Sequence, residues 1–155
     1  MKPVDGLVMS GVRGVRRAWY KRWCMSGPQT HRRIDRDLCG TPVWIADGLA
    51  EVRLETVPAM AVDEQGLVHG GFMFGLADHA AMLAINDPNV VLSGASTRFL
   101  RPVRVGDVVV AFATCAAVQG RRHTVAVEVR RGEEPVMTGE FHCVVLGRHV
   151  LEPST

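Results

Sequence analysis

The sequence predicts an α+β fold with a long central helix wrapped by an antiparallel sheet of five to six strands. One observation is that residues Gly71 to Asn86 are apolar around almost the whole circumference of a helix, which must therefore be buried on most sides. A second is a set of strand-like segments on both sides of this helix, joined by hairpin-length turns that favour antiparallel pairing. A third is the lack of an internal repeat, which leaves one helix against one face of one sheet.

The elements expected before the helix are short. They are a helical turn at residues 35–39, a strand at 43–45, a second strand at 49–56 and a loop at 57–69. The second strand alternates apolar and charged residues, which is the period of a half-buried strand. Asp47-Gly48 supplies the turn between the two strands.

After the helix, which ends at Asn86-Asp-Pro88, four more strands are expected. They cover residues 90–100, 106–119, 122–131 and 135–146. Because each strand follows the previous one after a short turn, we expect a four-strand meander in which every strand pairs with the next.

The 155 residues suffice for one domain, expected at residues 31–149 between a basic extension at 1–30 and a tail at 150–155. Residues 1–33 hold eight basic side chains against one acid, a net charge of +7. The remaining chain holds ten basic and fifteen acidic side chains, a net charge of −5, which argues against nucleic-acid binding by the folded part. No run of eighteen uncharged apolar residues occurs, and we expect no stable membrane insertion.

The basic extension leaves two interpretations open. It is a poorly ordered arm, or it is an amphipathic helix, with Trp19 and Trp23 near one face, that lies on a membrane surface or a partner. It shows no secretory signal, so we expect a cytoplasmic protein with reduced cysteines that behave as small hydrophobes. None of the four cysteines has the spacing of a CxxC pair or a zinc site, and we expect no metal.

The clearest chemical signal lies at the start and in the middle of the helix. Gly70 and Gly71 stand where a loop enters the helix, and they let another group approach the backbone closely. The first N–H groups of a helix have no partner within the helix and suit an oxyanion or a polarised carbonyl. Asp78 lies almost two turns further on the same face. Burial would raise its pKa and suit it to act as a general base or nucleophile; alternatively, it accepts hydrogen bonds from a loop and fixes the packing.

Three motifs resemble a known family. They are His69-Gly70-Gly71 with Asp78 further along, the strand from Ser96 that leads through Pro102 to Gly106-Asp107, and the segment 136–142. Together they resemble the hot-dog thioesterases of the phenylacetate-degradation type, over about residues 35–147. The resemblance implies the hot-dog fold and the hydrolysis of an acyl-CoA thioester to a free acid and CoA. It implies no metal and no redox cofactor, with CoA present only as part of the substrate.

The resemblance also implies roles for individual residues. Asp78 would attack the thioester or activate water, and the Gly70 N–H would polarise the carbonyl. Ser96 or Thr97, in the strand after the helix, would assist. The family often has an Asn six residues before the His, where this chain has Asp63. A carboxylate there cannot donate an amide hydrogen bond, and it adds negative charge near Asp78.

Further residues are expected to bind the substrate, and these are His69, Gly71, Arg98, Arg101 and Arg121. The first two shape the loop at the helix start. The arginines would contact the phosphates of CoA, with a solvated surface role as the alternative for each. His79 points about 100° away from Asp78 around the helix, and we expect it to serve packing or an interface.

Two other functions stay open. One is a non-enzymatic protein that binds or senses acyl-CoA, as the family's lipid-responsive regulators do, and the departure at Asp63 favours it. The other is a hydratase or dehydratase of the same fold, which ranks last because its His-containing loops are not visible. A single curved sheet leaves a strand edge open, so we expect a homodimer or homotetramer. In that assembly Asp78 would lie near Gly70 of the facing protomer.

Overall fold

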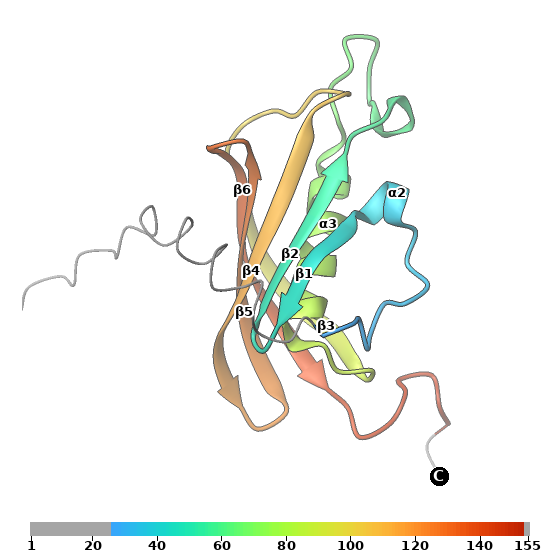
Figure 1. Ribbon diagram of the computed structural model, residues 1–155, viewed down its shortest axis with the longest axis vertical. Coiled ribbons are helices and arrows are strands. Elements are labelled where there is room, and N and C mark those ends of the chain that lie inside the picture. Colours follow the sequence, from blue (N-terminus) through green and yellow to red (C-terminus); the bar gives the residue numbers. More distant parts are fainter. Residues whose placement is uncertain (1–25, 154–155) are drawn as a thin grey trace, which may run out of the picture.

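The structure, a computed structural model that describes residues 26–153, contains one six-stranded antiparallel sheet and one long helix (Figure 1). Its elements in chain order are α2 (Arg36–Cys39), β1 (Thr41–Ala46), β2 (Leu49–Glu55), the 3-10 helix η2 (Pro58–Met60), α3 (Gly70–Ile85), β3 (Val90–Phe99), β4 (Val108–Gln119), β5 (Arg122–Arg131) and β6 (Glu134–Val145). The α+β class and the wrapped helix are confirmed. The predictions for residues 1–25, including Cys24, lie outside the described residues.

Helix α3 begins one residue before its predicted start, because His69 caps it. The His69 ring accepts a hydrogen bond from the Gly71 N–H, and Asn86 closes the other end in a left-handed conformation. Between the caps, nine of its residues are buried, and these are Met73, Leu76, Ala77, His79, Ala80, Ala81, Met82, Leu83 and Ala84. Burial on so many sides requires cover from more than the sheet.

The sheet has the strand order β1-β2-β4-β5-β6-β3, so the expected four-strand meander is wrong in one respect. Strands β4, β5 and β6 do pair in succession, but β3 pairs with β6 and not with β4. Residues 100–107 between β3 and β4 are not a tight turn. Hydrogen bonds from Val68 to Val103 and from Gly106 to Thr56 hold this connection across the end of the helix. It therefore delivers β4 to the β2 side and leaves β3 at an edge.

Residues 26–40, here called the strap, cover the side of α3 that the sheet does not reach (Figure 1). The Asn86 side chain joins the strap to the helix end, accepting from the Gln29 N–H at 2.7 Å and donating to the Gly27 carbonyl at 3.1 Å. Gly40, at φ 92°, fits against Leu76, since an added Cβ would lie 2.6 Å from its Cδ1. Residues 26–30 were assigned to the basic extension from the sequence, but they pack on the domain.

Within residues 26–153, no helix is both long and apolar enough to cross a membrane. The described cysteines are free thiols: Cys143 is buried, while Cys39 and Cys115 are half-buried.

Candidate functional site

One side of α3 is left partly uncovered between the strap and the last strands. Gly71, Phe74, Gly75 and Asp78 share this side, because they recur at intervals of three and four residues. Phe74 packs on Phe141 of β6, with ring centroids 5.4 Å apart. We call these four residues the open stripe. It contains one charged group in an otherwise apolar surface.

Asp78 is the group on this stripe whose environment is chemically unusual. Its Oδ1 is buried and has no hydrogen-bond partner among the described residues. Burial raises the pKa of Asp78 from its ordinary value of 3.8 to about 6. Burial first and the nearby Asp78 charge second also raise the pKa of the Cys143 thiol to about 12. The surroundings of the Asp78 carboxylate therefore make it a stronger proton acceptor than an exposed aspartate.

The start of α3 presents backbone N–H groups. The Gly71 N–H is used by the His69 Nδ1 at 2.7 Å, whereas the Gly70 N–H has no partner among residues 26–153. Both glycines lie close to an aromatic ring. A Cβ on Gly71 would lie 2.7 Å from the His69 ring, and one on Gly70 would lie 3.1 Å from the Phe99 ring. His69 thus positions the helix start through its ring, and Gly70 keeps a donor available for a ligand oxygen.

Gly70 and Asp78 are too far apart in one chain to act on one atom. Eight residues of α-helix span about 12 Å along the axis. A base and an oxyanion donor must both lie within about 3 Å of the reacting group. A single protomer therefore holds both kinds of group but does not bring them together.

A groove of about 300 Å³ opens next to Gly70. The helix start and the connection after β3 line it, with Val68, Gly70, Met73, Phe99, Leu100, Arg101, Pro102 and Val103. Val68, Met73 and Val103 are buried and form its floor. Phe99 and Leu100 form exposed walls, at 57% and 39% relative exposure. Apart from Arg101, every lining residue is apolar.

Ser96 and Thr97 point to opposite faces of the sheet. Directly paired residues share a face, and Thr97 pairs with Gly139, in register with the buried Phe141 and Met137 of β6. Thr97 therefore faces the helix side, and Ser96, opposite the exposed Glu140, faces away. Of the two, only Thr97 lies on the side of Asp78.

Asp63 lies in the exposed loop before the helix, and its carboxylate is already engaged. Its Oδ1 accepts from the Gln65 N–H at 3.0 Å and from the Leu67 N–H at 3.1 Å. These bonds hold the turn at Gly66, which has φ 80°. Asp63 therefore has a clear structural role in its own loop.

The three candidate arginines do not converge in one protomer. Arg101 lines the groove and forms an ion pair with Glu134 at 3.3 Å. Arg98 is exposed and pairs with Thr138, on the outer face of the sheet. Arg121 stands level with Val145 at the far end of the sheet, about 30 Å from Arg101 by the rise of the strand. Only Arg101 is next to Gly70.

His79 is buried on the strap side, which confirms the expected packing role. Its Nδ1 lies 3.0 Å from the Cys39 carbonyl, and its ring stacks on His31 at 6.2 Å. Burial lowers the pKa of His79, and the neighbouring His31 and Arg36 lower it further. No group of three His, Cys, Asp or Glu side chains placed to hold a metal occurs within residues 26–153.

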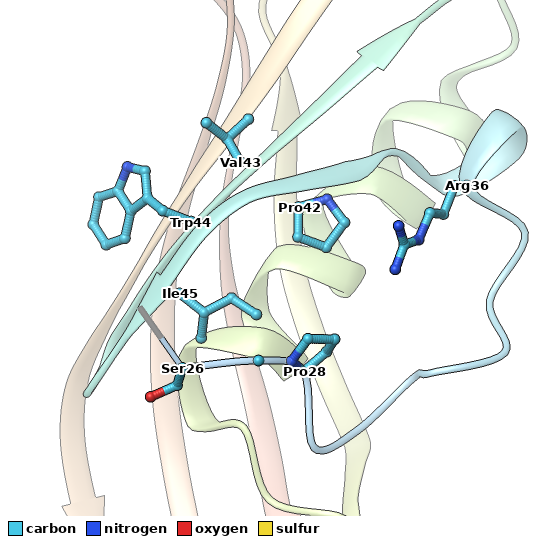
Figure 2. Close-up of a pocket in the computed structure, with 8 residues that line it drawn as sticks. Ser26, Pro28, Arg36, Pro42, Val43, Trp44 and Ile45 are labelled. Carbon is cyan, nitrogen blue, oxygen red and sulfur yellow. The ribbon is translucent and has the colours of Figure 1, made fainter. Parts of the chain in front are cut away.

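A second hollow, of about 260 Å³, lies between the strap and β1. Figure 2 shows Arg36 and Pro28 on one side of it and β1 on the other, where Ile45 points toward α3 and Trp44 away from it. It shares no lining residue with the groove at Gly70, and Arg36 is its one ionisable lining residue. This hollow brings no predicted site residue together.

Phe99, Leu100 and Met73 line the groove and were not singled out from the sequence. The period of two along β3 carries a usable signal for Phe99, because it shares a face with Thr97 two residues earlier. No local pattern identifies Leu100 or Met73, since their place depends on how the connection crosses the helix.

Comparisons with known proteins agree with this fold. The family model described as the thioesterase superfamily matches residues 65–138, which include the helix start, Asp78 and the groove. An uncharacterised protein of Pyrococcus horikoshii has a solved structure that is 52% identical, covers 84% of this chain and 100% of its own, and has a TM-score of 0.83. The structure of an Asn-to-Asp variant of the phenylacetic acid degradation protein PaaI from Thermus thermophilus is 30% identical. The match covers 70% of this chain and 95% of the PaaI chain, with a TM-score of 0.65.

The chain therefore belongs to the thioesterase superfamily and has the hot-dog fold. Curated relatives are more varied in what they are. A methylthioribose-1-phosphate isomerase of Aquifex aeolicus is 49% identical over 76% of this chain, and the transcription factor FapR of Shouchella clausii is 36% identical over 54%. A putative esterase of Deinococcus radiodurans is 38% identical over 59%. The matches span 26%, 44% and 61% of these relatives, so most extend well beyond the matched region.

Proposed function

We propose that this protein is an acyl-CoA thioesterase. Water adds to the thioester carbonyl, the carbon–sulfur bond breaks, and the CoA thiolate leaves with a proton. As a general base, Asp78 removes the proton from water and returns it to the departing sulfur. As a nucleophile, Asp78 would instead attack the carbonyl and expel the CoA thiolate; water then hydrolyses the resulting anhydride, regenerates the carboxylate and supplies the proton that the thiolate takes up. The Gly70 N–H stabilises the oxyanion. Membership of the thioesterase superfamily supports this class of reaction.

The observation that carries the proposal is the state of Asp78. Its Oδ1 is buried without a hydrogen bond from residues 26–153, and its pKa is about 6. A base with a pKa near the working pH is efficient because it is ionised yet still binds a proton readily. A structural carboxylate at this position would have acquired partners, as Asp63 has.

The separation of about 12 Å between Gly70 and Asp78 is resolved if two protomers share each site. Strand β3 is a ten-residue edge strand, and a second copy can pair with it. The middle of β3 is Ala95, which pairs with Phe141, and Phe141 packs on Phe74. Gly70 and Asp78 lie four residues before and after Phe74. A two-fold axis through the middle of β3 therefore sets Asp78 level with Gly70 of the second copy.

The open stripe favours the same arrangement. Among residues 26–153, Gly75 has only the Cys39 sulfur within 4 Å of an added Cβ, so a second helix can approach there. The other open edge is less suited to pairing, because β1 contains Pro42 and its Ile45 carbonyl already accepts from the Ser26 N–H. We propose a homodimer, or a tetramer built from it, with two shared sites in each dimer.

The proposal is tested by thiol release from a panel of acyl-CoAs, followed by subunit mixing. Asp78→Asn removes the base, and Gly70→Pro removes one N–H at the first helical position, where proline is tolerated. Each variant alone should be inactive. Unfolding and refolding them together in equal amounts should restore about a quarter of the wild-type activity, because half of the dimers are mixed and each holds one intact site. Absence of turnover in the wild type would refute the proposal, and absence of restoration would refute sharing.

The second candidate is an acyl-CoA sensor without turnover. The similarity to the transcription factor FapR favours it, as does Asp63 in place of an Asn. It predicts that acyl-CoA binds to the wild type and to Asp78→Asn with equal affinity, while neither releases thiol. Calorimetry beside the thiol assay separates the two candidates.

A further inference from the structure

We infer that the groove beside Gly70 binds a neutral, apolar acyl group of short to medium length, and that Phe99 is the residue that determines this specificity. The inference rests on the proposed function, because it assigns an acyl group to a site next to the oxyanion donor. Its observations are the position of Phe99, the composition of the groove and the ion pairs that hold its walls.

Phe99 is placed unusually for a large aromatic residue. It pairs with the buried Met137 and so faces the helix side of the sheet, yet it is 57% exposed. It is the last residue of an edge strand, and its ring extends over the start of α3. Its Cε1 lies 3.1 Å from the position that a Cβ on Gly70 would occupy. A ligand whose carbonyl oxygen accepts from the Gly70 N–H therefore has this ring beside the next atoms of its chain.

Ion pairs and hydrogen bonds from residues that do not line the groove hold its walls in place. Arg131 binds Asp107 at 2.8 Å, Glu134 at 2.6 Å and the Pro102 carbonyl at 3.1 Å. The Leu100 N–H also donates to the Val136 carbonyl at 2.8 Å. Ion pairs and backbone bonds on both sides of Pro102 keep the connection from closing onto the helix. The groove is therefore preformed, which lowers the ordering cost of binding.

The charge at the groove indicates which acyl groups fit. Arg101 is the only charged lining residue in the described part of the chain, and its guanidinium already pairs with Glu134 at 3.3 Å. An acyl group that ends in a carboxylate would have to compete with Glu134 and to desolvate its own charge against Val68 and Met73. A neutral hydrocarbon chain meets no such cost.

The size of the groove sets an upper length. Its volume is about 300 Å³, at the small end of ligand sites. If a methylene needs about as much space as a water, roughly 30 Å³, the groove holds at most about ten of them. Longer chains must extend beyond the groove that this protomer forms, and each added methylene there buries less surface against it.

The test uses the full chain, in wild-type form and as Phe99→Ala, Phe99→Leu and Val118→Ala. Val118 is the control, because it is similarly exposed, at 58%, on β4 away from the groove. For the wild type, kcat/KM should rise by up to about fourfold per methylene from propionyl- to octanoyl-CoA and level off by dodecanoyl-CoA. Pentanoyl-CoA should exceed glutaryl-CoA, which has the same length and a terminal carboxylate, by about tenfold or more.

Phe99→Ala should lower kcat/KM for octanoyl-CoA by about tenfold or more and leave propionyl-CoA within about threefold. Phe99→Leu should recover part of the loss, and Val118→Ala should behave as wild type. Equal effects on short and long chains, or a preference for glutaryl-CoA, would overturn the inference. So would dissociation of the dimer by Phe99→Ala in sedimentation, because the loss of activity would then follow from loss of the shared site and not from the groove.

A binding measurement separates this inference from the proposed function. Calorimetry of Asp78→Asn with S-propyl- and S-octyl-CoA, which are thioethers and cannot be hydrolysed, reports on the groove alone. In one outcome, the wild type hydrolyses no acyl-CoA, S-octyl-CoA binds at least about tenfold more tightly than S-propyl-CoA, and Phe99→Ala removes this difference in affinity. The inference then holds and the thioesterase proposal fails. In another outcome, the wild type hydrolyses acyl-CoA, but the two thioethers bind with equal affinity whether or not Phe99 is replaced by Ala. The inference about the groove then fails, and the thioesterase proposal stands.

Discussion

Two neighbouring residues of α3, Asp78 and His79, face opposite surroundings. Both are ionisable groups in an apolar helix. Burial raises the pKa of Asp78 and lowers the pKa of His79, and both shifts favour the neutral form of the side chain. His79 has a hydrogen-bonding carbonyl at 3.0 Å and a stacked ring above it, whereas the buried Oδ1 of Asp78 has no partner within residues 26–153. Burial alone therefore does not mark a functional group. What distinguishes the two sides of the helix is whether the fold also satisfies the buried atom.

The largest expected effect is on turnover. Asp78→Asn should lower kcat by about 10²-fold or more and leave KM nearly unchanged, because a general base acts only in the transition state. Asp87→Asn is the matched control: Asp87 follows the same helix, and its side chain only accepts from the Asn89 N–H at 2.8 Å. Retention of activity within about threefold in Asp78→Asn would remove the catalytic side of the comparison.

Substitutions on the side of α3 that faces the strap should lower the stability of the fold and leave turnover unchanged. His79→Ala removes a buried ring and leaves the Cys39 carbonyl without its partner, which should cost about 2–4 kcal/mol in urea unfolding. The kcat of the folded fraction should stay within about threefold. His142→Ala, at an exposed side chain on β6, should change stability by about 0.5 kcal/mol or less. A loss of kcat in His79→Ala without a loss of stability would contradict the comparison.

The two groups should also give opposite dependences of stability on pH. The pKa of Asp78 is raised on folding, so the folded state binds more protons there and loses stability as pH rises from about 4 to about 6. The pKa values of His79 and His31 are lowered on folding, so stability falls as pH drops below about 6.5.

Asp78→Asn separates these contributions. It should gain about 1–2 kcal/mol over the wild type above about pH 7, after allowance for the part-exposed site, and the gain should vanish below about pH 4. In the variant, only the loss of stability below about pH 6.5, which His79 and His31 cause, should remain. Urea unfolding between about pH 4 and pH 8 measures both slopes. A gain that stays constant across this range would show that the Asp78 pKa is not raised.

The sequence was sufficient to predict the helices and strands, but not to predict the strand pairing of β3 or the packing of the strap on α3. The ends of α3 were predictable within one residue, because a glycine pair and Asn86-Asp-Pro88 are local signals. The place of β3 was not, because its pairing with β6 depends on a connection that crosses the end of the helix. The helical phase separated Asp78 from His79, yet only the strap, whose bonds to the helix join residues 40–59 positions apart, explains why His79 is satisfied.

The candidate site shows the same limit. Gly70 and Asp78 were singled out because their residue types are unusual in a motif that resembles a family, and Arg101 because an arginine could contact a CoA phosphate. Phe99 was not singled out, although it shares a face of β3 with Thr97, because an aromatic residue in a strand is ordinary and its exposure follows from the strand's edge position. Asp63 was noticed as a departure from the family, but its two hydrogen bonds to the loop could not be read from the sequence.

The smallest expected effect concerns Asp63, and it sharpens the contrast between a satisfied and an unsatisfied carboxylate. The amide oxygen of Asp63→Asn can accept the same two N–H groups, so stability should change by about 0.5 kcal/mol or less. The substitution also removes one negative charge and adds an amide donor, as in the family's usual residue. We expect kcat to stay equal or to rise by a few fold. Thiol release with a saturating acyl-CoA, beside urea unfolding, gives both values. A loss of kcat of about tenfold with intact stability would instead make Asp63 a second carboxylate at the reacting centre, and the division between structural Asp63 and functional Asp78 would no longer stand.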